Sequence, residues 1–384
     1  ADRVFGSVFM WASLTALFVV FLVHLVRHLS QSKNKWVSDI AIVVISVVVS
    51  LLVAEGVVRG VGVEPWLSQS NRITVDPGGR LEQVHPSLGY SLIPGEFTVM
   101  LPRGYSFKAT HLADGARITH PLATYGELPK KKEIWVFGCS FTYGWSLNDD
   151  ETYPWLLQEQ FPDYEVVNFG NLGYSTLHAM IGFEEALKKR DKPALVIYSY
   201  ASFHDERNVF TRNRRKAVGP ENKLGPFGQP YARLENGRLN YYRTEGVEYH
   251  PFPLQEQSAL VHWIEQNYNA FEVASSNASA VTEEILTDFA HAARKNNVPF
   301  VVAGIDSESR KMLEFLRQKG IPTVDISVDL SQQQKYRNLP YDSHPNALAN
   351  RIYAEKLGDY LRREILKTSE QVTVPVQASS SERQ

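Results

Sequence analysis

An apolar run that ends in a serine carries the strongest chemical signal in this sequence. Residues 133–144 read EIWVFGCSFTYG, so Ser140 stands just after a strand-like segment and opens a polar, helix-like one. A tight turn between strand and helix would raise the Ser140 hydroxyl above the edge of a sheet. Its backbone NH, at a helix N-terminus, would be free to donate to a developing oxyanion. Taken alone, the pattern also fits a serine that merely caps a helix.

A second signal near the C-terminus completes a possible catalytic group. The segment Asp342-Ser343-His344-Pro345 places a carboxylate two residues before a histidine. A serine becomes a good nucleophile when a base takes its proton and a third group orients that base. Ser140, His344 and Asp342 are therefore the candidate nucleophile, base and orienting acid of acyl-group chemistry. The chain has no His-Glu-x-x-His or paired-cysteine spacing, so we expect neither a metal nor a cofactor.

The surrounding sequence alternates between strand-like and helix-like segments, which predicts a parallel sheet covered by helices. The predicted strands are 134–137, 165–169, 194–198, 300–303 and 322–325, and the predicted helices are 176–190, 282–295, 307–319, 346–366 and one from about 152. We expect an insertion at about 203–270, in which Asn236-Gly237 centres a tight hairpin. Residues 61–132 read as a β-rich or irregular lead-in, and residues 367–384 as a disordered tail.

Two apolar runs near the N-terminus are each long enough to span a bilayer. One is Val4 to Val26, and the other is Val37 to Val58, interrupted by Asp39 and Glu55 near its ends. A hydrocarbon core needs about 20 helical residues, whereas a secretory signal has a shorter apolar region. We therefore expect a transmembrane helical hairpin over residues 1–60, with a buried hairpin of a soluble protein as the alternative.

The flanking charges predict the orientation of this hairpin. The loop between the runs carries Arg27, His28, Lys33 and Lys35, and the positive-inside rule places such a loop in the cytoplasm. Both ends of the hairpin then face the other side, so in a bacterium the inner membrane would carry the soluble domain on its periplasmic or extracellular face. Glu55, near a helix end, is expected to be solvated at the interface.

Composition excludes some function classes. Forty basic residues are balanced by forty-two acidic ones in a chain of 384, so nothing indicates nucleic-acid binding. Cys139 is the only cysteine, so no intrachain disulfide can form and the redox compartment stays open. We interpret Cys139 as a small buried residue.

Three sequence blocks resemble those of the SGNH (GDSL-type) hydrolase superfamily, over roughly Glu133 to Leu366. Residues 138–144 (GCSFTYG) are similar to its first block, residues 168–176 (NFGNLGYST) to its second and residues 342–346 (DSHPN) to its last. The resemblance implies a flavodoxin-like α/β/α sandwich that cleaves or transfers ester-linked acyl groups without a metal. It also implies Ser140 as nucleophile, His344 as base and Asp342 as its orienter, and backbone NH groups of Ser140 and Gly173 as oxyanion donors.

The third block departs from the family pattern. After residues 195–198 the family usually has Gly-x-Asn-Asp, whose asparagine is a third oxyanion donor, but this chain reads SYASFHDERN. His204 or Asn208 is then the candidate replacement. Losing one such donor typically costs on the order of 100- to 1,000-fold in turnover.

The sequence thus predicts a membrane-anchored serine esterase or O-acyltransferase. Its expected substrate is an acylated envelope glycan, glycolipid or polysaccharide, and a multi-spanning membrane protein is a candidate partner. The alternative is a weak or inactive SGNH-like accessory subunit of a larger membrane complex. The role of a basic run stays open: it is either a solvated loop or an anion-binding site, and its residues are Arg207, Arg212, Arg214, Arg215 and Lys216. The role of three aromatic residues also stays open: Trp145, Tyr153 and Trp155 either pack against the sheet or line a sugar-binding cleft.

Overall fold

The computed structural model describes residues 27, 35–66, 73–126 and 130–366. It divides into two compact units. One comprises residues 1–68 with 251–268, and the other comprises residues 69–250 with 269–384. The candidate site residues all belong to the second unit.

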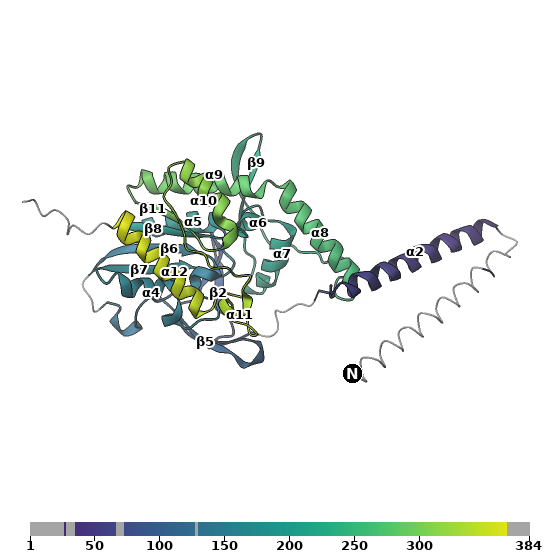
Figure 1. The fold of residues 1–384 in the computed structure, drawn as a ribbon, viewed down its shortest axis with the longest axis horizontal. Helices are drawn as coiled ribbons and strands as arrows, with labels where there is room; N and C mark the ends of the chain where they lie inside the picture. Colours follow the sequence, from purple (N-terminus) through teal and green to yellow (C-terminus); the bar gives the residue numbers. More distant parts are fainter. Residues whose placement is uncertain (1–26, 28–34, 67–72, 127–129, 367–384) are drawn as a thin grey trace, which may run out of the picture. The chain divides into compact units, whose positions relative to one another are not determined.

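A five-stranded parallel sheet forms the centre of the second unit (Figure 1). Its strands are β6 (Lys132–Gly138), β7 (Tyr164–Gly170), β8 (Leu195–Tyr200), β11 (Phe300–Gly304) and β12 (Thr323–Asp325). They lie in the order β7-β6-β8-β11-β12, which is the flavodoxin-like order 2-1-3-4-5 when the strands are counted along the chain. In such sheets the ligand crevice lies beyond the carboxyl ends of the strands, where the strand order reverses. Here that point lies between β6 and β8, which pair directly.

Helices cover both faces of the sheet, as the predicted alternation requires. They are α4 (Tyr153–Gln160) and α12 (Ala347–Tyr360) on one face, and α5 (Thr176–Lys189), α9 (Ala278–Lys295) and α10 (Arg310–Gln318) on the other. Because side chains alternate along a strand, Trp135 and Phe137 of β6 pack toward α5 and α9, whereas Ile134 and Val136 pack toward α4 and α12. Both faces are therefore buried, which explains the nearly continuous apolar sequence of β6.

The lead-in contains five short strands in two small antiparallel sheets. They are β1 (Thr74–Asp76), β2 (Glu82–His85), β3 (Gly89–Leu92), β4 (Gly95–Met100) and β5 (Ser106–His111). The 3-10 turn η1 (Pro102–Gly104) joins β4 to β5, and η2 (Leu122–Thr124) follows β5. A third turn, η3 (Asp149–Glu151), precedes α4. The order β1-β4-β5 forms one sheet and β2-β3 the other.

The predicted insertion between β8 and α9 combines helices, a β-hairpin and irregular segments. It contains α6 (His204–Asn208), α7 (Arg212–Val218), η4 (Gly219–Leu224), β9 (Pro230–Glu235), β10 (Arg238–Arg243) and α8 (Ala259–Ser275). The predicted Asn236-Gly237 hairpin is confirmed, since Glu235 pairs with Arg238 and both turn residues have positive φ. The remaining short elements are η5 (Ser307–Ser309), α11 (Gln333–Tyr336) and the π-helical turn η6 (Leu361–Ile365).

In the first unit, α2 (Lys35–Gly60) contains the second apolar run. Among the described residues it is the one helix long and apolar enough to cross a membrane, and its apolar side chains are largely exposed. The first run, Val4 to Val26, lies outside the described residues. A single candidate span is therefore observed, and the two-helix hairpin is not confirmed.

Glu55 does not end in solvent, contrary to expectation. Its carboxylate accepts hydrogen bonds from the Ser258 hydroxyl at 2.7 Å and from the backbone NH groups of Ala259 and Leu260 at 2.9 and 2.8 Å. Arg59 donates to the same carboxylate at 2.7 Å. Glu55 thus caps the N-terminus of α8, where a negative charge is stabilised by otherwise unpaired NH groups.

A buried arginine holds the lead-in against the segment that follows Ser140. The Arg117 side chain is fully buried, and its Nε donates to Asp149 at 2.7 Å. Its remaining nitrogens donate to four backbone carbonyls, which belong to Lys108, Tyr143, Gly144 and Leu147. Five hydrogen bonds therefore converge on one guanidinium, whose planar fork of donors suits this arrangement.

Replacing Arg117 by methionine is expected to lower the free energy of unfolding by about 3–5 kcal/mol, because it leaves the Asp149 charge and four buried carbonyls without their partner. Chemical unfolding of the purified protein measures this loss. The exposed Arg294→Met is the matched control and should change stability by less than about 0.5 kcal/mol. A loss below about 1 kcal/mol for Arg117→Met would contradict the proposed clamp.

Candidate active site

Ser140 lies at the carboxyl edge of the sheet, as its sequence context predicts. It is the first residue of the short helix α3 (Ser140–Tyr143), directly after β6, and only 6% of its surface is exposed. Cys139 precedes it in an extended conformation, and Gly144 ends α3 with a positive φ of 86°. The serine hydroxyl is thus held on a sharp strand-to-helix turn.

His344 and Asp342 meet Ser140 there, although 204 residues separate Ser140 from His344. The Ser140 hydroxyl and His344 Nε2 are 2.9 Å apart, and His344 Nδ1 and Asp342 Oδ1 are 2.6 Å apart. An ionised carboxylate only accepts hydrogen bonds, so Nδ1 carries the proton and Nε2 accepts from the serine. The chain of hydrogen bonds therefore runs in the direction that proton removal from Ser140 requires.

Asp342 is held as a carboxylate by its surroundings. Burial alone would raise the pKa of Asp342, but hydrogen bonds from His344 and the charge of its ring outweigh burial and bring this pKa below the usual 3.8. The backbone NH of His344 donates to the same Oδ1 at 2.7 Å, and Trp145 Nε1 donates to Oδ2 at 3.3 Å. Asp342 is therefore ionised at any pH near neutrality.

Residues at the end of β7 fix the position of α3. Asn168 donates from its side chain to the Thr142 carbonyl at 3.1 Å and accepts from the NH of Gly170 at 2.9 Å. A Cβ at Gly170 would lie 2.3 Å from the Tyr143 nitrogen, so only glycine allows α3 to approach this strand so closely. The sequence predicted this block, but not that its asparagine braces the serine helix.

A cleft of about 570 Å³ opens beside the serine and histidine. Gly173 borders it together with Ser140 and His344, and has a positive φ of 65°. Of the three aromatic residues considered as cleft lining, Trp145 borders the cleft. Tyr153 is fully buried and bonds Thr142 and Ser199, so it packs the core instead.

Comparison of the chain with known proteins yields similarity in structure only. No family model matches the sequence, and no curated protein does either. The structure is similar to a lipolytic protein of the G-D-S-L family from Desulfitobacterium hafniense, at 13% identity and a TM-score of 0.35, over 60% of this chain and 99% of that one. It is also similar to a G-D-S-L lipolytic protein from Veillonella parvula, at 11% identity and a TM-score of 0.32, over 60% and 99%. The esterase AlinE4 of the SGNH-hydrolase family gives 13% identity and a TM-score of 0.29, over 51% and 77%.

The fold of the chain is similar to that of SGNH hydrolases.

The segment after β8, which was expected to supply a third oxyanion donor, is where the structure differs from the sequence prediction. His204 and Asn208 are four residues apart on α6, so both lie on the face that packs into the protein, and both are fully buried. His204 Nδ1 lies 2.8 Å from the Tyr198 hydroxyl, and Asn208 bonds Thr176, Leu177 and Thr282. Burial lowers the pKa of His204 well below its usual value, so its ring is neutral. Neither side chain borders the cleft, and the geometry does not support either as an oxyanion donor.

Two arginines of the basic run border the cleft beside Ser140, where His204 and Asn208 do not. These are Arg207 of α6 and Arg214 of α7. Neighbours on the same run point elsewhere: Arg212 donates to the His250 carbonyl, and Arg215 lies 3.8 Å from Glu272. Sequence alone could not separate them, because which arginine faces the cleft depends on how each helix is rotated against the sheet.

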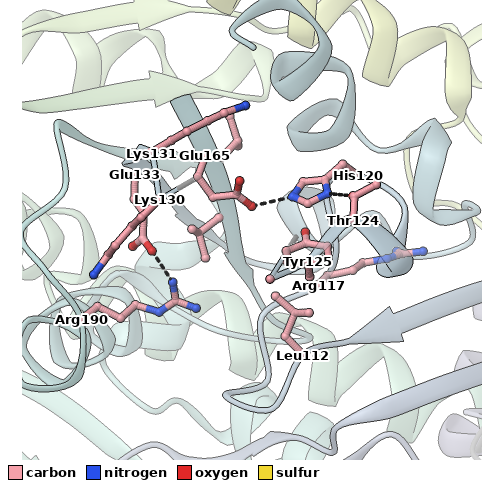
Figure 2. Close-up of a pocket in the computed structure, with 13 residues that line it drawn as sticks. Leu112, Arg117, His120, Thr124, Tyr125, Lys130, Lys131, Glu133, Glu165 and Arg190 are labelled. Carbon is pink, nitrogen blue, oxygen red and sulfur yellow. Dashed lines mark hydrogen bonds and ion pairs between the residues drawn. The ribbon is translucent and has the colours of Figure 1, made fainter. Parts of the chain in front are cut away.

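A second cavity, of about 270 Å³, lies at the amino ends of β6 and β7, whereas the cleft beside Ser140 lies at the carboxyl ends of the strands (Figure 2). Its polar side chains bond one another: His120 lies 2.7 Å from Glu165, and Arg190 lies 2.7 Å from Glu133. The candidate triad is absent from its lining. We therefore place the chemistry in the cleft at the carboxyl ends.

Proposed function

We propose that this protein is a membrane-anchored serine esterase or O-acyltransferase. The observation that carries the proposal is the continuous hydrogen-bond chain from Ser140 through His344 to Asp342, at the mouth of a cleft beside the topological switch point. Such a chain activates a hydroxyl for attack on an acyl carbonyl.

The proposed reaction begins with attack of Ser140 Oγ on the carbonyl carbon of an ester while His344 Nε2 accepts the serine proton. Asp342 stabilises the imidazolium that forms. The backbone NH groups of Ser140 and Gly173 donate to the oxyanion of the tetrahedral intermediate. His344 then protonates the leaving alcohol, and water or a sugar hydroxyl takes the acyl group from Ser140 by the reverse steps.

The proposed setting is the outer face of a cytoplasmic membrane. Support comes from α2, whose length and exposed apolar surface suit a membrane span, and from the positive charges before it in the sequence. Acyl esters of an envelope glycan, glycolipid or polysaccharide are the substrates we propose, and a multi-spanning membrane protein is the partner we propose.

The test is active-site labelling of the full chain in detergent with a fluorophosphonate probe, together with acetate release from p-nitrophenyl acetate. We expect one label per chain, located at Ser140 by peptide mass spectrometry. A folded protein that neither takes the label nor releases acetate would favour the alternative of an accessory subunit.

A further inference from the structure

The cleft beside Ser140 carries an excess of positive charge. Its lining includes four basic side chains and two acidic ones; the basic residues are Arg80, Arg207, Arg214 and Lys223, and the acidic residues are Glu82 and Glu206. The two arginines contributed by α6 and α7 lie against residues 173 and 174, which include the proposed oxyanion glycine.

Arg214 is buried, and the acceptors of its hydrogen bonds within the described residues are neutral. Only 3% of its surface is exposed, and its Nη2 donates to two neutral groups, the Tyr90 hydroxyl at 3.1 Å and Gln229 Oε1 at 3.3 Å. Its buried Nε has no hydrogen-bond partner among the residues that the structure describes. A Cβ built on Gly173 would lie 3.0 Å from Nη1, so the guanidinium lies directly against the proposed oxyanion glycine.

Arg207 contacts the residue that follows Gly173. Its Nη1 donates to the Tyr174 carbonyl at 3.0 Å, and its guanidinium stacks on the Phe203 ring at 4.5 Å from the ring centre. Burial lowers the pKa of Arg207, and the nearby positive charge of Arg214 lowers it further. Within the described part of the chain, neither arginine forms an ion pair with a carboxylate.

Arg214 is buried and Arg207 is half-buried, and in the described part of the chain both donate to neutral groups. Removing such charges from water is costly, and a bound anion lowers that cost. We propose that Arg207 and Arg214 bind a permanently anionic group of the substrate, a carboxylate or a phosphate, next to the ester that Ser140 attacks. The planar donors of arginine match both groups. This inference rests on the proposed function and narrows its substrate class to acyl esters of acidic glycans or phosphorylated lipids and sugars.

The test compares acetyl esters that differ in one charged group: acetylated glucose, acetylated glucuronic acid and acetylated glucose 6-phosphate. With the full chain in detergent, we expect kcat/KM to be at least about tenfold higher for one of the two anionic esters than for acetylated glucose, mainly through KM. The preferred anion tells a carboxylate site from a phosphate site. Equal kcat/KM for all three esters would overturn the proposal.

The variant that tests the anion site is Arg207→Gln. The Arg207 side chain is half-buried, so we expect the variant to fold. Thermal unfolding checks that it does. We expect the variant to lose the preference for the anionic ester, so that its kcat/KM falls at least about tenfold more on that ester than on acetylated glucose. Arg238→Gln, on the tip of the β9-β10 hairpin, is the matched control and should keep the preference. An equal fall in kcat on neutral and anionic esters would overturn the subsite and assign Arg207 to the oxyanion instead.

Calorimetric titration tests the anion site independently of ester cleavage. If the protein turns over no ester, titration with glucuronate, glucose 6-phosphate and glucose still tests the subsite. Binding of an anionic sugar, but not glucose, that is lost in Arg207→Gln supports the subsite even then. Absence of anion binding to the wild-type protein overturns it.

Discussion

Replacing Ser140 by alanine is expected to lower kcat on p-nitrophenyl acetate by about 10⁴- to 10⁶-fold and to abolish fluorophosphonate labelling. The alanine removes the hydroxyl that forms the acyl-enzyme bond in the proposed reaction. His344→Ala is expected to cause a similar loss, because the hydroxyl then has no base within hydrogen-bond distance. Steady-state kinetics of acetate release measure both effects.

The double variant Ser140→Ala/His344→Ala gives the sharpest form of this result. Ser140 and His344 act as one unit, so removing either one already removes the contribution of both to kcat. The kcat of the double variant should therefore be no lower than that of the slower single variant. Ser307→Ala, at a serine outside the cleft, is the matched control and should keep full activity. Losses that multiply, or a Ser140→Ala variant with more than about 1% of wild-type kcat, would show that Ser140 and His344 do not work as nucleophile and base.

Asp342→Asn is expected to lower kcat by about 10⁴-fold near neutral pH while leaving KM nearly unchanged. The asparagine amide can donate to His344 Nδ1, which favours the tautomer that carries its proton on Nε2. That tautomer cannot accept the proton of Ser140. The rate of acetate release for this variant measures the effect, and Asp163→Asn, on an exposed turn, is the matched control.

The low pKa of Asp342 also has a consequence for the dependence of stability on pH. The pKa of Asp342 is lower in the folded protein than the 3.8 of the unfolded chain, so the ionised carboxylate stabilises the folded protein at pH values above the unfolded pKa. This stabilisation is lost as the pH falls through the pKa of Asp342 in the folded protein. Between pH 5 and pH 3, the wild type should therefore lose more stability than Asp342→Asn. Thermal unfolding of both proteins at the two values tests this, and equal losses would contradict the ionised state assigned to Asp342.

Much of the fold was predictable from local pattern. The apolar strands that contain Trp135 and Phe137 alternate with amphipathic helices, and burial on both faces of a parallel sheet imposes that alternation. The Asn236-Gly237 turn was predictable for a similar reason, since both residues tolerate positive φ. Asp342 and His344 are two residues apart, so their hydrogen bond is also a local property of the chain.

The sequence by itself determined the residue types of the triad, the order of strands and helices around them and the apolar helix before them, because each depends on neighbouring residues. Only the tertiary structure decided which side chains enter the cleft. Arg207 and Arg214 border it, whereas His204 and Asn208, on the same stretch of chain, are buried. The clamp by Arg117 is equally a matter of tertiary structure, as it joins carbonyls from two distant segments. The direction of a side chain depends on how its helix or strand packs against the rest of the fold, and spacing along the chain does not contain that information.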